Sequence, residues 1–120
     1  MSFTAIVLDE DSRTLAAEVA ARYGIAPIQW DTKLHHVTLA MGTPSGFHIG
    51  EERILTATHA GRTEGRVTAF KVAGAEDSTN KVPHVTIAVA KGAKPVESNQ
   101  IIEWREIKPF TIRGKVEICH

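Results

Sequence analysis

The chain has 120 residues, a length typical of one domain, and its 14 basic and 14 acidic residues cancel to a formal net charge of zero. Proteins that bind long nucleic acid non-specifically usually carry a strong basic excess, so this class is disfavoured. Binding of a small anionic ligand needs only a few local hydrogen-bond donors, so the charge balance does not exclude it. The single cysteine, Cys119, excludes an internal disulfide and a cysteine-rich metal site.

The hydropathy pattern predicts a soluble protein without a membrane partner. No run approaches the roughly 18 apolar residues of a membrane span. Residues 1–4 lack the basic and apolar regions of a secretory signal, so we expect a cytoplasmic protein. A chain of this length buries about two-thirds of its unfolded surface, so the fold needs neither disulfide nor metal. We expect a single domain over residues 1–120.

The first part of the chain predicts a strand, a helix and a second strand. Residues 3–8 are mostly apolar and predict a central strand. Residues 9–12 supply helix-capping side chains, and the helix is expected to run to about Tyr23. An apolar stripe at helical spacing supports this helix: Leu15, Ala16, Val19, Ala20 and Tyr23. After a connector, residues 34–41 predict the second strand.

The middle of the chain predicts a hairpin followed by a third β-prone run. Residues 54–59 and 67–72 read as two strands joined by the turn sequence Gly-Arg-Thr-Glu-Gly. A polar segment then leads through Pro83 into a predicted strand over residues 85–90. Proline suits the first position of a strand because it lacks the N–H that pairing would use.

The last part predicts a short helix over residues 95–104 and a final strand over residues 110–118, with a bulge at Gly114. The order is therefore β-α-β, a hairpin, then β-α-β. It predicts an α+β fold with antiparallel or mixed sheets and two outer helices.

A five-residue segment occurs twice. His-Val-Thr-Leu-Ala at residues 36–40 recurs as His-Val-Thr-Ile-Ala at residues 84–88. In a strand, side chains two positions apart share a face, so each copy presents an imidazole and a hydroxyl backed by apolar residues. Composition alone gives roughly 0.6 His-x-Thr matches, so two matches in one β context indicate a shared role. The alternative is two unrelated strands that each carry a polar pair.

Two imidazoles and two hydroxyls facing a common groove suit cleavage of a phosphodiester. A neutral histidine takes the proton of an attacking water or ribose 2′-OH, and a protonated one gives a proton to the departing oxygen. Histidine fits both roles because its ordinary pKa is about 6.5. The hydroxyls donate to the non-bridging oxygens, where charge gathers in the transition state. This chemistry requires no metal or other cofactor, and the residues alone do not say which histidine is the acid.

The paired motifs resemble the signature of the 2H phosphoesterase superfamily. Within it, the chain is most similar to the phage anti-CBASS nucleases, on these segments: residues 3–9, 34–39, 80–89 and 92–99, and Trp104. The resemblance implies a bilobal, pseudo-symmetric α+β fold with a central groove. It also implies hydrolysis of the cyclic di- and trinucleotides that bacteria use as antiviral signals, in the host-cell cytoplasm.

The resemblance also implies roles for six residues. The motif residues would be catalytic, with the histidines as acid and base and the threonines binding phosphate: His36, Thr38, His84 and Thr86. Glu97 and Trp104 would lie at substrate-binding positions. An indole at that place either stacks on a base or packs against the sheet.

The other polar residues have weaker claims. His35 has the opposite strand parity to His36, so it either supports the site from behind or sits in a partly buried polar spot, and the structural role is favoured. His48 and His59 are expected on the surface. Four cations near the second motif either attract an anionic ligand or are simply solvated: Lys81, Lys91, Lys94 and Arg105.

Three other functions remain open on the sequence. The same four residues would open 2′,3′-cyclic phosphates at RNA ends. A non-catalytic module would hold a nucleotide in the same groove without turnover. A histidine-based zinc site is the weakest alternative, because only His36 and His84 are expected to meet and no cysteine or carboxylate has ligand spacing beside them.

Overall fold

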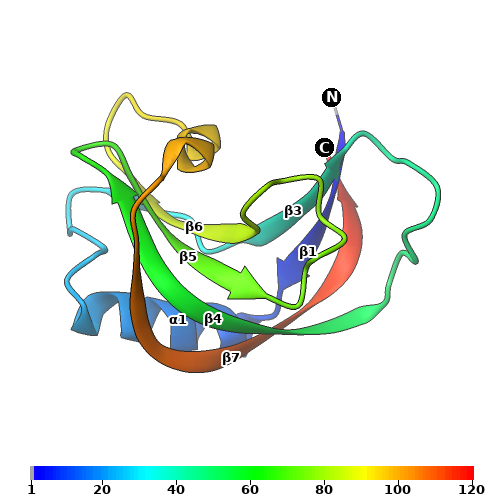
Figure 1. The fold of residues 1–120 in the computed structure, drawn as a ribbon, viewed down its shortest axis with the longest axis horizontal. Helices are drawn as coiled ribbons and strands as arrows, with labels where there is room; N and C mark the ends of the chain where they lie inside the picture. Colours follow the sequence, from blue (N-terminus) through cyan, green and yellow to red (C-terminus); the bar gives the residue numbers. More distant parts are fainter. Residues whose placement is uncertain (1) are drawn as a thin grey trace.

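A computed structural model describes residues 2–120 and shows an α+β fold dominated by a six-stranded barrel (Figure 1). The strands are β1 (Phe3–Leu8), β2 (Asp31–Thr32), β3 (His36–Met41), β4 (Glu52–Thr63), β5 (Val67–Ala73), β6 (His84–Val89) and β7 (Trp104–Cys119). The helices are α1 (Glu10–Arg22) and a 3-10 helix, η1 (Pro95–Gln100). No helix among residues 2–120 is long and apolar enough to cross a bilayer.

The barrel closes because β6 pairs on both sides. Its strand order is β6-β3-β1-β7-β4-β5, and β5 returns to β6. Every pair is antiparallel, so the predicted choice between antiparallel and mixed sheets is settled as antiparallel. The two-residue strand β2 also pairs with β6, along the same edge as β3 (Asp31↔Val89). The strand over residues 3–8 is confirmed as central, between β3 and β7.

Apolar side chains at alternate strand positions fill the barrel and pack against α1. The largest fully buried side chains of this core include Phe70, Ile6, Leu34, Leu39, Leu55, Ile87 and Ile112. Helix α1 begins where predicted, because the Asp9 carboxylate accepts a hydrogen bond from the Ser12 N–H at 2.8 Å. Ala16, Val19 and Ala20 of α1 join the core.

Tyr23 does not belong to the buried stripe, so that prediction is wrong. The helix ends at Arg22, and Tyr23 is its C-cap with 47 % of its surface exposed. The Tyr23 hydroxyl instead accepts a hydrogen bond from the Lys108 N–H at 3.2 Å. A periodic pattern alone does not show that the helix ends one residue earlier.

The C-terminal elements also differ from the prediction. The predicted helix over residues 95–104 is the shorter η1, and β7 starts at Trp104 rather than at residue 110. Residues 104–106 pair with β4 in the register Gly61↔Trp104, Ala60↔Arg105 and His59↔Glu106. A long partner strand thus recruits a polar segment whose own sequence has little strand preference.

Gly114 is a site of close backbone approach, and the predicted bulge there is wrong. Gly114 pairs with Leu8 of β1 on one side and with Arg53 of β4 on the other, and neither register is interrupted there. The irregularity lies instead between Ala57 and His59 of β4. A Cβ at Gly114 would sit 2.4 Å from the Val7 carbonyl oxygen, so only glycine allows β1 and β7 to approach this closely.

We therefore expect Gly114→Ala to lower the free energy of unfolding by about 2–3 kcal/mol, because the clash is with backbone and no rotamer relieves it. The matched control is Gly65→Ala, which meets nothing within 4 Å but has a positive φ of 69°. It should cost only about 1 kcal/mol. Urea unfolding of both variants checks this, and an equal or smaller loss in Gly114→Ala would contradict it.

Candidate active site

The two histidine motifs meet where β3 pairs with β6. Val37 pairs with Val85, which sets the two motifs side by side on antiparallel strands. Both valines are fully buried in the barrel core, so the side chains at alternate positions point outward. The structure therefore gathers all four motif side chains on one outer face, which we call the His-Thr patch (His36, Thr38, His84 and Thr86).

The arrangement differs from the expected one, in which two strands face each other across a groove. The motifs are neighbours in one barrel wall, related by a local two-fold axis between the paired valines (Figure 1). Beyond this pair, β3 gains other partners. The Thr79 N–H donates to the Leu39 carbonyl at 2.7 Å, and the Ser78 hydroxyl donates to the Thr38 carbonyl at 2.8 Å. The segment before β6 thus borders the patch at Thr38.

His84 has a defined proton position. Its Nδ1 lies 2.7 Å from the Val82 carbonyl oxygen, which only accepts, so Nδ1 carries the hydrogen. In the neutral ring, Nε2 is then a free lone pair and can accept a proton. His84 is 8 % exposed, and this burial lowers its pKa, although the bond to Val82 partly offsets the shift.

His36 is half-buried and also uncharged near neutral pH. Burial is the main cause that lowers its pKa to about 4, and the charges of His35 and His84 add to the effect. The Phe3 ring packs at 4.9 Å between centroids, tilted by 42°. The sequence did not indicate Phe3 as a neighbour of His36, because the contact arises from pairing between β1 and β3.

His35 is not the partly buried structural residue that strand parity predicts. It is exposed, and its Nδ1 lies 3.0 Å from Nδ1 of His36. Leu34 has a positive φ of 47°, which breaks the alternation of faces just before β3 begins. His35 lies outside β3, which begins at His36, so the alternation of a strand does not apply to it. His48 is exposed as expected, whereas His59 is half-buried, with Nδ1 2.8 Å from the Thr58 hydroxyl.

Thr86 has a buried partner that sequence reasoning missed. Its hydroxyl lies 2.9 Å from the hydroxyl of Ser98, a residue of η1 that is 1 % exposed. No spacing rule links the two, because η1 meets β6 only through the tertiary fold. Ser98 fixes the Thr86 hydroxyl on the patch.

The carboxylate oxygens of Glu97 already accept hydrogen bonds from other residues of the chain. Oε2 accepts from the Lys94 N–H at 2.6 Å, and both oxygens accept from the Arg66 guanidinium, at 2.8 and 3.1 Å. The Arg66 contact is the main cause that holds the pKa of Glu97 below its ordinary value. In this arrangement Glu97 anchors η1, and through η1 it supports Ser98.

Trp104 lies beside the patch. Its ring centroid is 6.4 Å from that of His84, and it packs with Ile101 in a small second cluster on Val67, Ala69 and Val89. Its Nε1 is buried and has no hydrogen-bond partner within residues 2–120. The structure thus shows the packing contact and leaves stacking on a base as a prediction.

The remaining predictions concern the cations near the second motif and metal binding. The four cations near the second motif are all exposed: Lys81, Lys91, Lys94 and Arg105. Among residues 2–120 no group of three or more histidine, cysteine, aspartate or glutamate side chains could hold a metal ion.

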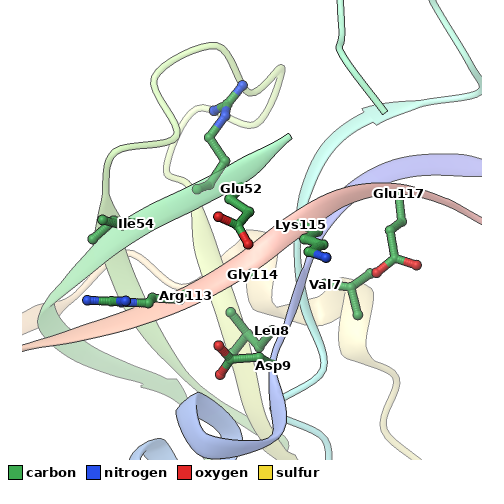
Figure 2. A pocket seen from close by; sticks show the side chains of 10 residues that line it. Val7, Leu8, Asp9, Glu52, Ile54, Arg113, Gly114, Lys115 and Glu117 are labelled. Carbon is green, nitrogen blue, oxygen red and sulfur yellow. The ribbon is translucent and has the colours of Figure 1, made fainter. Parts of the chain in front are cut away.

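A separate cavity of about 580 Å³ opens on the outer side of β1, β4 and β7 (Figure 2). Asp9, Glu52, Arg113 and Lys115 line it, so both signs of charge are present, and none of the patch residues takes part. Val7 also lines it and pairs with His36 across β1 and β3, which places the cavity one strand away from the patch.

Comparisons of the chain with known protein families, curated proteins and solved structures gave no match. We therefore argue the function from the His-Thr patch and its chemistry.

The low pKa of His36 makes stability depend on pH in a defined window. Between pH 6.5 and 4 the unfolded chain binds a proton at His36 that the folded chain does not, so the free energy of unfolding should fall as the pH is lowered. His36→Gln should flatten this decline, whereas His48→Gln at an exposed position should not. Urea unfolding from pH 7 to pH 4 measures it. Parallel curves for wild type and His36→Gln would refute the assignment.

Ser98→Ala tests the contact with Thr86. Loss of a buried hydroxyl partner should lower the free energy of unfolding by about 1 kcal/mol. The matched control is Asn99→Ala, the next residue of η1, which is exposed and should change stability by less than about 0.5 kcal/mol. Thermal unfolding of both variants checks this, and equal midpoints would contradict the contact.

Proposed function

We propose that this chain is a metal-independent phosphodiesterase of the 2H phosphoesterase type that hydrolyses cyclic di- and trinucleotides. One observation carries the proposal: the Val37–Val85 register gathers two imidazoles and two hydroxyls on one outer face. Two histidines supply the acid and the base of phosphodiester cleavage, and two hydroxyls supply donors for the phosphate oxygens.

His84 is suited to begin the reaction as the base. Its Nδ1–H is held by the Val82 carbonyl, so its Nε2 lone pair is available to take the proton of a nucleophile. The nucleophile is a water, or a 2′-hydroxyl of the substrate. His36, whose position across the strand pair faces the other side of a bound phosphate, supplies the proton for the departing oxygen.

Because burial lowers the pKa values of the imidazoles, the acid forms only when bound substrate raises the pKa of His36 and the ring takes up a proton from solvent. Burial keeps both rings neutral near pH 7 in the free protein. A bound phosphodiester carries a negative charge, and an opposite charge within about 4–6 Å favours the protonated form of histidine. Substrate binding therefore creates the acid at the moment when it is needed.

The two threonines act as neutral donors to the phosphate. Thr86 is oriented by Ser98, and Thr38 lies next to Val37, the residue that pairs with β6. A neutral hydroxyl donor stabilises the charge that develops on the phosphate oxygens without raising the charge of the site.

Two features favour small cyclic oligonucleotides over long nucleic acid. The net charge is zero, while four exposed cations lie near the second motif in the sequence. Trp104 lies next to His84 and offers an aromatic face for a base. The local two-fold relation of the motifs supports a pseudo-symmetric arrangement of the 2H type. The resemblance over residues 80–104 adds immune evasion in a host-cell cytoplasm as the setting.

Cleavage of a panel of cyclic di- and trinucleotides in EDTA tests the proposal. Wild type should cleave at least one member, and His36→Ala or His84→Ala should lose about 10²–10⁴-fold in rate. Thr38→Ala or Thr86→Ala should lose about 10²-fold. His48→Ala, at an exposed histidine of the loop between β3 and β4, should match wild type. Cleavage that survives both histidine substitutions would sink the proposal.

The same experiment separates the alternatives. A 2′,3′-cyclic nucleotide opened faster than every cyclic oligonucleotide would move the assignment to RNA end processing. Tight binding of a cyclic dinucleotide with no turnover over hours would identify a non-catalytic binding module instead.

A further inference from the structure

The backbone just before β3 is strained and held in place from several sides. Leu34 has a positive φ of 47°, a region that costs a non-glycine residue about 1 kcal/mol or more, and it is 2 % exposed. Its N–H donates to the Thr86 carbonyl at 2.9 Å, and its carbonyl accepts from Arg13 Nε at 3.1 Å. The next carbonyl, of His35, accepts from the Leu8 N–H at 2.9 Å.

Directly after this turn, two consecutive imidazoles lie side by side. In a regular strand His35 and His36 would point to opposite faces. Instead their Nδ1 atoms lie 3.0 Å apart, with ring centroids 5.2 Å apart and ring planes at 79°. A distance of 3.0 Å between two ring nitrogens requires one of them to carry a hydrogen and the other to accept it.

The unequal exposure of the two rings indicates which one donates. His35 is exposed, whereas His36 is half-buried, and burial disfavours a charge on His36. The His35 ring, which solvent reaches, is therefore the donor through its Nδ1–H. Nδ1 of His36 is then the acceptor, and the neutral His36 ring keeps its hydrogen on Nε2.

We propose that His35 is a positioning residue: its Nδ1–H donates to Nδ1 of His36 and fixes the His36 hydrogen on Nε2. The two motif histidines thereby become opposite tautomers. His84, bonded to the Val82 carbonyl, offers a lone pair at Nε2, whereas His36 offers an N–H at Nε2. The His84 tautomer follows from its bond to the Val82 carbonyl, and the His36 tautomer follows from the 3.0 Å contact and the unequal exposure of the two rings. The roles of proton acceptor for His84 and proton donor for His36 rest on the proposed function, in which a bound phosphate raises the pKa of His36 so that its ring takes up a second proton.

The tautomers are measured without any substrate. In the full chain at pH 7, long-range proton–nitrogen NMR spectra distinguish a ring nitrogen that carries hydrogen from one that does not. We expect hydrogen on Nε2 of His36 and on Nδ1 of His84. Hydrogen on Nδ1 of His36 would overturn the proposal.

Two substitutions at His35 test whether it is the cause. His35→Asn places an amide N–H close to the position of Nδ1 and should keep the His36 hydrogen on Nε2. His35→Leu removes the donor, and signal should appear for hydrogen on Nδ1 of His36. An unchanged His36 tautomer in His35→Leu would also refute the role. His35 is exposed, so both variants should fold as wild type does.

A measurement of cleavage rates tests whether His35 also affects catalysis. His35→Asn should retain the cleavage rate within about threefold, whereas His35→Leu should lose about 10–100-fold, within the range that a misplaced acid or base costs. The control His48→Leu should match wild type. If no cyclic nucleotide is cleaved by wild type, the proposed function fails while the NMR result still decides the tautomer. Equal rates in His35→Asn and His35→Leu would refute the link to catalysis.

Discussion

The pairing of Val37 with Val85 is the constraint on which the candidate site depends. Both side chains are fully buried, and each contributes roughly 1.5–3 kcal/mol of apolar burial to the barrel. Because side chains alternate along a strand, a slip of β6 by one residue would turn its histidine and threonine inward and its apolar residues outward. Closure of the barrel, with β5 on the other side of β6, opposes such a slip. The polar patch is thus aligned by the apolar core behind it.

The same motif acquires two different environments. The antiparallel pair relates the copies by a local two-fold axis, but their neighbours break the symmetry. His84 is held by the Val82 backbone carbonyl and covered on one side by Trp104, whereas His36 is held by the side chain of His35. Two identical residue types in unlike surroundings are the usual way in which one site obtains distinct proton donors and acceptors.

Much of the fold follows from local patterns in the chain. Residues 3–8 and helix α1 are where apolar periodicity and a capping aspartate predict them, and the predicted β4–β5 hairpin is present. Its turn is shorter than predicted, because β4 continues through residues 61–63. The first half of β7 and the short extent of η1 could not be predicted this way. Residues 104–106 form a strand because β4 provides partners, and strand preference depends on such partners more than on the segment itself.

The amino-acid sequence alone was enough to select the His-x-Thr residues as candidates and to predict which of their neighbours face the core, because motif spacing and strand alternation are local properties. Only the tertiary structure decided that the two motifs are paired neighbours in one barrel wall, that Ser98 reaches Thr86, and that His35 lies against His36. Contacts between residues far apart in the chain arise from strand register and barrel closure, which have no local signature. The strained turn at Leu34 adds a local exception, since His35 lies between this turn and the start of β3 and is not part of a strand.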